Sequence, residues 1–149
     1  MADTTKPDAS GVAVIRAGDG PSTRGAAANF TGVVHVEGRF QQDLPARVGG
    51  ATVTFDPGAH TGWHTHPLGQ TLVVTRGHGF VQEWQQPAHA FGPGDVIWIP
   101  PGVKHWHGAA PGEAMTHVAI AEMLDGRSVT WMELVSDSQY AEAVGHSQP

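Results

Sequence analysis

Residues 58–77 read GAHTGWHTHPLGQTLVVTRG, and residues 94–105 read GDVIWIPPGVKH. Both stretches place short runs rich in Val, Ile, Thr and Trp between glycines and prolines, a pattern typical of β-strands joined by tight turns. His64 and His66 are separated by one residue, and residues i and i+2 of a strand point to the same face. The first stretch therefore predicts two imidazoles that converge on one point, which Gln70 can face from the next strand.

Glycines and prolines also separate short apolar runs in the rest of the chain, on both sides of these stretches. Gly 20 and Pro 11 make up about a fifth of the 149 residues, against roughly 12% in an average protein, which argues against a helix bundle. Turn signals spaced by about eight to twelve residues are typical of an all-β sandwich or barrel, and eight strands are a jelly-roll number. The expected strands are residues 32–37, 51–55, 62–66, 70–75, 79–84, 95–99, 105–108 and 115–122.

A short C-terminal helix and two tails complete the predicted domain. Ser136 and Gln139 form a capping-box pattern that opens a helix ending near Val144. The polar residues 1–11 and 145–149 are expected to be disordered tails. Residues 12–144 are then predicted to form a single domain that is large enough to bury its own core.

Composition excludes several classes of function. The net charge of -6, with only 8 Lys+Arg, disfavours a nucleic acid or an anionic membrane as partner. With no cysteine, the chain has no disulfides, thiolate metal ligands or cysteine nucleophile. It also lacks the G-x-S-x-G turn of serine hydrolases, an apolar run of membrane-spanning length and an apolar run of signal-peptide type. We expect a cytoplasmic protein that acts on a small molecule.

The ten histidines are the most unusual feature of the composition, and eight of them fall within residues 60–117. His105 and His107 form a second i, i+2 pair on a later predicted strand. Two such strands facing a common interior can supply three or four nitrogen and oxygen donors to one divalent ion. The ordinary role of a surface or hydrogen-bonded side chain is assigned to five isolated histidines: His35, His60, His78, His89 and His146.

These residues and their spacings resemble the two sequence motifs of the cupin family. The first motif matches at every spacing from Gly58 to Gly77, with Gln70 in place of the usual Glu. The second matches from Gly94 to His105, followed by Ala where Asn is customary. The resemblance implies a single cupin β-barrel, the double-stranded β-helix or jelly roll. It also implies a set of metal ligands: His64, His66, Gln70 and His105.

A closer resemblance is to the small bacterial manganese-type cupins that act as hydroxynitrile lyases. It rests on HTHPLGQT at residues 64–71, KHWHGAAP at 104–111 and AMTH at 114–117. The resemblance implies a metal-dependent lyase of hydroxynitrile (cyanohydrin) or retro-aldol type, and a homodimer or homotetramer. Mn(II) is the first choice of metal, with Fe(II), Co(II), Ni(II) or Zn(II) as alternatives.

The residues themselves suggest how such a site would work. Gln70 is neutral, so a divalent ion keeps its full +2 charge and is a stronger Lewis acid than it would be beside a Glu ligand. His107 shares the face of His105, and His117 occupies a face with small residues, so either imidazole can carry a proton near the ion. In the resembling lyases, the role of proton carrier is implied for the residue matching His107, with His117 as its partner. His107 could instead only orient a ligand.

Small side chains are expected to line the rest of the pocket. Alternation along residues 51–55 favours Ala51 and Val53 on the inner face, which matches the resembling lyases. Ala121 would leave room for an aromatic substrate, and the Thr61 hydroxyl is a candidate substrate contact. Water is expected to be excluded by Leu72, Val74 and Trp98 or Trp106.

Two other functions remain open at this level. The same donors with open positions can activate oxygen, as in an iron- or manganese-dependent cupin dioxygenase. A non-catalytic cupin that binds a metal or a small ligand needs the same fold and ligands. Oxygen uptake and anaerobic aldehyde release separate the two enzymes.

Overall fold

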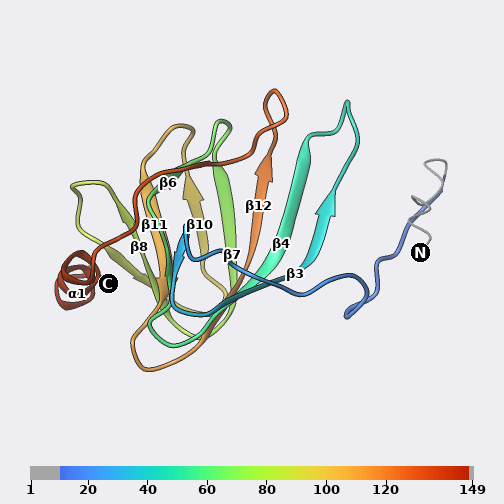
Figure 1. The fold of residues 1–149 in the computed structure, drawn as a ribbon. Helices are drawn as coiled ribbons and strands as arrows, with labels where there is room; N and C mark the ends of the chain where they lie inside the picture. The colour runs from blue at the N-terminus through green and yellow to red at the C-terminus, as the bar shows by residue number, and fades with distance from the viewer. Residues whose placement is uncertain (1–10, 148–149) are drawn as a thin grey trace.

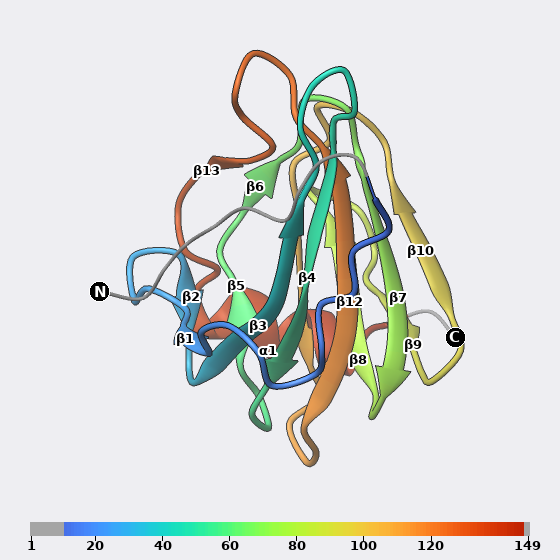
Figure 2. The same ribbon diagram turned by 90° about the vertical axis from the view of Figure 1, so that its right-hand side faces the viewer.

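The computed structural model describes residues 11–147, which form two curled antiparallel sheets around a central cavity (Figure 1). The larger strands belong to a six-stranded sheet and lie side by side in Figure 2. In spatial order, this sheet contains β1 (Thr23–Arg24), β3 (Val34–Gln41), β4 (Val48–Phe55), β12 (Met115–Glu122), β7 (Gln70–Arg76) and β10 (Val96–Ile99).

The second sheet has seven shorter strands. Its main path contains β13 (Thr130–Trp131), β6 (His64–Thr65), β11 (His105–Ala109), β5 (His60–Thr61) and β2 (Phe30–Thr31). Two further strands, β8 (Gly79–Glu83) and β9 (His89–Phe91), extend it beside β11. β11 pairs with β5, β6 and β8, so it is the central strand of this sheet.

Alternation along the long strands separates the interior from the surface. In β4, Ala51, Val53 and Phe55 are buried, whereas the intervening Thr52 and Thr54 are half-buried on the other face. The same inner face holds a core cluster of apolar side chains from both sheets. Since burial of one large apolar side chain stabilises a fold by about 2–3 kcal/mol, this cluster fixes which strand faces point inward.

The helix α1 (Asp137–Gly145) covers the outside of the seven-stranded sheet (Figure 1). Its capping box is present, with Ser136 Oγ accepting from Gln139 N and the Gln139 side chain accepting from Ser136 N. Tyr140 donates its hydroxyl proton to Ala109 O at 2.7 Å, which attaches the helix to β11. A second apolar cluster around Trp106 fills the space between helix and sheet.

Gly77 shows why the first histidine stretch ends in a glycine. Its φ is +71°, a left-handed conformation that favours glycine. A Cβ at this position would also collide with the carbonyl oxygen of Ala114. The turn after β7 therefore needs a residue without a side chain, because the backbone before β12 passes directly against it.

The all-β barrel with a short C-terminal helix is confirmed, and every predicted strand overlaps an observed one. The prediction of a continuous strand over 62–66 was wrong, since only His64–Thr65 is a strand. Gly62 N donates to Asn29 O, whereas Trp63 N donates to Glu133 O. Consecutive residues of this segment therefore pair with different parts of the chain and do not continue one strand. Strands β1, β2, β5, β9 and β13 were not predicted because two or three residues show no periodicity.

The predicted tails at 1–11 and 145–149 lie mostly outside the described residues, although Gly145 belongs to α1, one residue beyond the predicted helix end. Within residues 11–147, no helix combines the length and the apolar composition needed to cross a bilayer.

Candidate metal centre

Three buried histidines meet between β6 and β11. His64 and His105 are directly opposite each other in the register of these strands, and their ring centroids are 4.2 Å apart. His66 follows two residues after His64, and its ring centroid lies 5.0 Å from that of His64. One ring nitrogen from each histidine lies within 4.8 Å of the other two. This spacing suits three donors that surround a single ion.

Backbone carbonyls fix the orientation of the three rings. The Nδ1 atoms of His64, His66 and His105 lie 2.8 Å from Gly62 O, 2.6 Å from Ser128 O and 2.9 Å from Val103 O, respectively. A carbonyl oxygen only accepts, so each Nδ1 carries the proton and each Nε2 keeps its lone pair. This is the arrangement that metal-bound histidines adopt, because the outer hydrogen bond sets the tautomer and orients the ring.

Gln70 provides a fourth donor at the start of β7. Its side chain is buried and lies beside His66, close enough to raise the pKa of that ring slightly against the larger effect of burial. Within the described chain, Gln70 Oε1 and the Nε2 atoms of His66 and His105 are buried without a hydrogen-bond partner. Buried polar atoms without partners are costly, and a divalent ion would satisfy all three of these atoms. The residues therefore fit a metal.

The electrostatics keep this donor set neutral. Burial, and then repulsion from His105, hold the pKa of His64 well below its ordinary value. Burial also lowers the pKa of His66, and it lowers that of His105 to about 4. Neutral imidazoles are the form that binds metals, and nitrogen-rich donor sets suit Mn, Fe, Co, Ni or Zn.

His107 and His117 form a second buried pair beside the donors. His117 Nε2 lies 3.1 Å from His107 Nδ1, so one of these nitrogens donates to the other. The His107 ring centroid is 5.3 Å from that of His64 and 4.8 Å from that of His117. His107 thus lies between the donor set and His117. Burial, followed by repulsion from His117 and His64, keeps the pKa of His107 well below its usual value, and burial lowers that of His117 to about 4.

Thr61 holds the backbone of His107. The amide N–H of His107 donates to Thr61 Oγ1 at 3.2 Å, and the threonine side chain is buried. The hydroxyl can donate its own proton to an oxygen or nitrogen in the cavity. Phe55 packs against both rings of the pair, with ring centroids 5.9 Å from His107 and 5.2 Å from His117.

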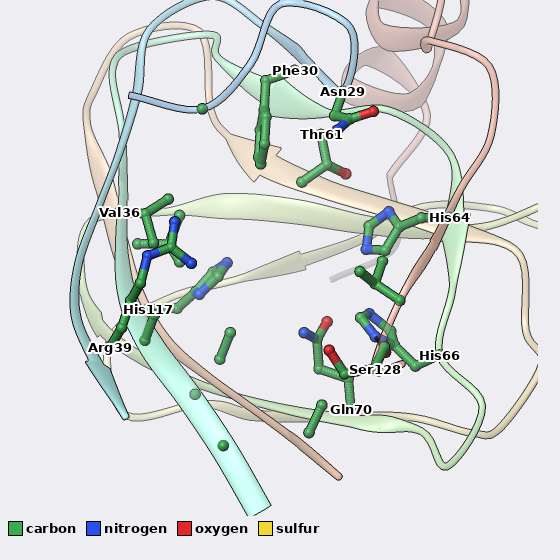
Figure 3. Close-up of a pocket in the computed structure, with 18 of the residues that line it drawn as sticks. Asn29, Phe30, Val36, Arg39, Thr61, His64, His66, Gln70, His117 and Ser128 are labelled. Atoms are coloured by element: carbon green, nitrogen blue, oxygen red, sulfur yellow. Dashed lines mark hydrogen bonds between the residues drawn. The ribbon is translucent and has the colours of Figure 1, made fainter. Parts of the chain in front are cut away.

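One cavity of about 720 Å³ is lined by the donors His64, His66 and Gln70 together with the histidine pair (Figure 3). In Figure 3, His64, His66 and Gln70 lie on one side of this space, and His117 lies across it. The volume falls within the range of about 300–1,000 Å³ that is usual for small-molecule sites. Its wall includes the four residues expected to form the pocket: Ala51, Val53, Thr61 and Ala121.

The prediction that Trp98 or Trp106 closes the pocket was wrong. Trp98 is 58% exposed because it shares the outer face of β10 with Val96, whereas Ile99 is buried on the other face. Trp106 points to the other face of β11 and packs under α1. The tryptophan in the cavity wall is Trp131, whose ring centroid is 4.7 Å from that of His64. Leu72 is fully buried, in line with its expected place in the interior.

Sequence reasoning also missed a polar part of the wall, formed by Asn29, Arg24 and Arg39. Two-residue strands and a register shift in β3 bring these residues to the cavity. Neither feature produces a periodic pattern in the sequence. Of the five histidines assigned ordinary roles, His60 is buried rather than exposed. Its Nδ1 donates to Gly58 O at 2.8 Å and its ring stacks on Tyr140.

Comparison with known proteins identifies the family. Residues 51–121 match the model of the cupin domain. An (R)-mandelonitrile lyase from Granulicella tundricola is 57% identical over 127 residues, which cover 85% of this chain and 97% of that protein. The chain belongs to the cupin family. Its triad of His64, His66 and His105 could hold a metal ion.

Solved structures agree on the fold of this cupin. A cupin-like protein from Thermotoga maritima is 41% identical, has a TM-score of 0.76, and the match covers 81% of this chain and 92% of that one. A cupin-2 domain protein from Rhodospirillum rubrum, 15% identical with a TM-score of 0.59, matches over 82% of this chain and 78% of that one. At 15% identity, the match to the Rhodospirillum rubrum protein shows a shared fold and nothing more.

Proposed function

We propose that this cupin is a metal-dependent hydroxynitrile lyase, which cleaves a cyanohydrin into an aldehyde and hydrogen cyanide. The observation that carries the proposal is the position of the neutral pair His107–His117 directly beside four neutral metal donors, at a largely apolar cavity. The 57% identity to an (R)-mandelonitrile lyase supports the same chemistry.

His64, His66, Gln70 and His105 would hold the metal. A divalent ion held there acts as a Lewis acid that polarises an oxygen of the substrate. Manganese is the first metal to test, followed by Fe(II), Co(II), Ni(II) and Zn(II). The neutral Gln70 leaves the positive charge of the ion undiminished, which favours Lewis-acid chemistry over a change of oxidation state.

His107 is the proposed proton carrier. This role requires the tautomer that carries the proton on His117 Nδ1, an atom that is buried and has no hydrogen-bond partner within the described chain. His117 Nε2 then accepts from His107 Nδ1, and His107 Nε2 keeps a lone pair. This lone pair takes the hydroxyl proton of the cyanohydrin. As the C–C bond breaks, its electron pair leaves with cyanide, and the same proton returns to give HCN.

The remaining residues orient the substrate and exclude water. Phe55 supports both histidine rings, and Ala51, Val53 and Ala121 leave space for an aromatic or aliphatic group. The Thr61 hydroxyl can donate to the substrate while its oxygen accepts from His107 N. A positioned proton carrier contributes about 10²- to 10⁴-fold to rate, so loss of His107 should remove most of the activity.

The test is anaerobic release of benzaldehyde from mandelonitrile by metal-loaded protein. We compare the wild type with His107→Ala and with His89→Ala, a control at an exposed histidine on β9. Metal content is measured for each variant, so that loss of the ion is not mistaken for loss of the base. The proposal fails if the wild type releases benzaldehyde no faster than buffer, or if His107→Ala retains full activity.

A cupin dioxygenase is the second candidate, because three histidines with open positions also suit oxygen activation. Oxygen uptake on addition of a flavonol or a diketone, without aldehyde release from cyanohydrins, would favour it. Binding of metal without either reaction would favour a non-catalytic cupin. The oligomeric state, homodimer or homotetramer, and the cytoplasmic location stay predictions of the sequence.

A further inference from the structure

The cavity has a second charged end. Arg24 and Arg39 line the same space as the donors His64, His66 and Gln70, and no Asp or Glu of the described chain contributes to its wall. Figure 3 shows Arg39 next to Val36 and His117, across the cavity from His66. A cavity with a cationic metal site at one side and arginines at the other favours a substrate with negative charge.

A β-bulge directs Arg39 to this position. Between β3 and β4, Glu37 is paired with Thr52 and Phe40 with Gly50, so β3 contains one more residue than its partner over this interval. Gly38 has φ +62°, which provides the left-handed residue of the bulge. Alternation from the buried Val34 and Val36 would turn residue 39 outward. The extra residue changes that alternation and brings Arg39 to the cavity wall.

Arg39 is held by a hydrogen bond and has no ion-pair partner among the described residues. Its Nη2 donates to Thr23 Oγ1 at 3.0 Å, and that hydroxyl donates to Val36 O at 3.4 Å. The remaining N–H groups of the guanidinium donate to no other residue of the segment 11–147, and their planar fork matches the two oxygens of a carboxylate. Arg39 is exposed on its solvent side, so this end is the mouth of the cavity.

We propose that Arg39, assisted by Arg24, selects substrates that carry an oxyanion at the end remote from the reacting carbon. The proposal rests on the proposed function for the chemistry at the metal end. A carboxylate or a phosphate ester provides this charge, and an aromatic aldehyde bearing either group in the para position is the simplest rigid probe. Arg39 is a specificity-determining residue and does not touch the bond that breaks.

Equilibrium binding tests the proposal without turnover. Metal-loaded protein is titrated with benzaldehyde, 4-formylbenzoate and 4-formylphenyl phosphate, followed by calorimetry and by the change in tryptophan fluorescence, to which Trp131 in the cavity wall contributes. A charge-assisted hydrogen bond contributes about 1.5–3 kcal/mol, so at least one anionic aldehyde should bind about tenfold or more tightly than benzaldehyde. The tighter of the two anions identifies the preferred group.

Variants assign the preference to Arg39. Arg39→Gln should abolish most of it, Arg39→Lys should retain part of it, and Arg76→Gln, an exposed arginine outside the cavity, should leave it intact. Raising the salt concentration should weaken the preference, because the guanidinium is partly in solvent. Equal affinity of the wild type for all three aldehydes, or an unchanged preference in Arg39→Gln, would overturn the proposal.

Kinetics separate this proposal from the proposed function. The ratio of kcat/KM for 4-carboxymandelonitrile to that for mandelonitrile should fall about tenfold or more in Arg39→Gln and stay constant in Arg76→Gln. If neither cyanohydrin is cleaved while the binding preference persists, the lyase assignment is wrong and the anion site stands. If both are cleaved with equal kcat/KM and bound equally, the anion site is wrong and the lyase stands.

Discussion

Replacing His60 by phenylalanine should destabilise the barrel in alkaline solution and stabilise it in acid. The His60 ring is 2% exposed, its Nδ1 donates to Gly58 O at 2.8 Å, and it stacks on Tyr140 with ring centroids 4.5 Å apart. Phenylalanine keeps the stacked ring and removes the hydrogen bond and the titratable group. Burial lowers the pKa of His60 below 6.5 in the folded state.

The two effects have different dependences on pH. Because the folded pKa lies below the unfolded value, the unfolded chain takes up the proton first, and stability is lost as the pH falls from about 6.5 toward the lowered pKa. At pH 5 this loss is at most about 2 kcal/mol, whereas the hydrogen bond contributes about 1 kcal/mol at any pH. His60→Phe should therefore be about 1 kcal/mol less stable at pH 8 and up to about 1 kcal/mol more stable at pH 5.

Urea titrations of both proteins at pH 8, 6.5 and 5 in the presence of a chelator measure this difference. The other histidines are common to both proteins, so their contributions cancel. His89→Phe, at an exposed ring on β9, is the matched control for loss of a histidine. A free-energy difference between His60→Phe and the wild type that does not change with pH would refute the claim that buried His60 stays neutral.

Three further perturbations test the centre and its supporting turns. His105→Ala should lose bound metal in elemental analysis, and retention of a full equivalent would remove His105 from the ligand set. Gln70→Glu should bind the ion more tightly in competition with a chelator and lower kcat for mandelonitrile, because the carboxylate reduces the charge of the site; weaker binding would contradict this. Gly77→Ala should destabilise the fold by about 2 kcal/mol or more in urea titrations, since strain at positive φ adds to the collision with Ala114 O. Gly94→Ala, with φ +90° but open space, should cost only about 1 kcal/mol, and equal losses would show that the collision is relieved.

Local periodicity was enough to predict the two histidine pairs. His64 and His66, like His105 and His107, are two residues apart, and the direction of side chains along a strand repeats every two residues. The same rule put His117 on one face with Ala119 and Ala121, and the structure shows that this face lines the cavity. These predictions needed no knowledge of which strands pair, because each depends only on neighbours in the chain.

Features that depend on distant pairing could not be predicted. The carbonyl that orients His66 belongs to Ser128, 62 residues away. Trp98 and Trp131 are both tryptophans on strands, and only the folded structure shows that the face of β10 that carries Trp98 points to solvent. Arg39 reaches the cavity through one extra residue in β3, a register shift that the pattern of residue types does not show.

Metal-dependent cleavage of mandelonitrile is the most direct test of the central claim. Purified protein is stripped with a chelator, divided, and reloaded with Mn(II) in one portion, and benzaldehyde release is followed without oxygen. We predict about one equivalent of bound metal and a rate at least about a hundredfold above that of the stripped protein. Equal rates in the two portions, at confirmed metal occupancy, would contradict the assignment of this cupin as a metal-dependent lyase.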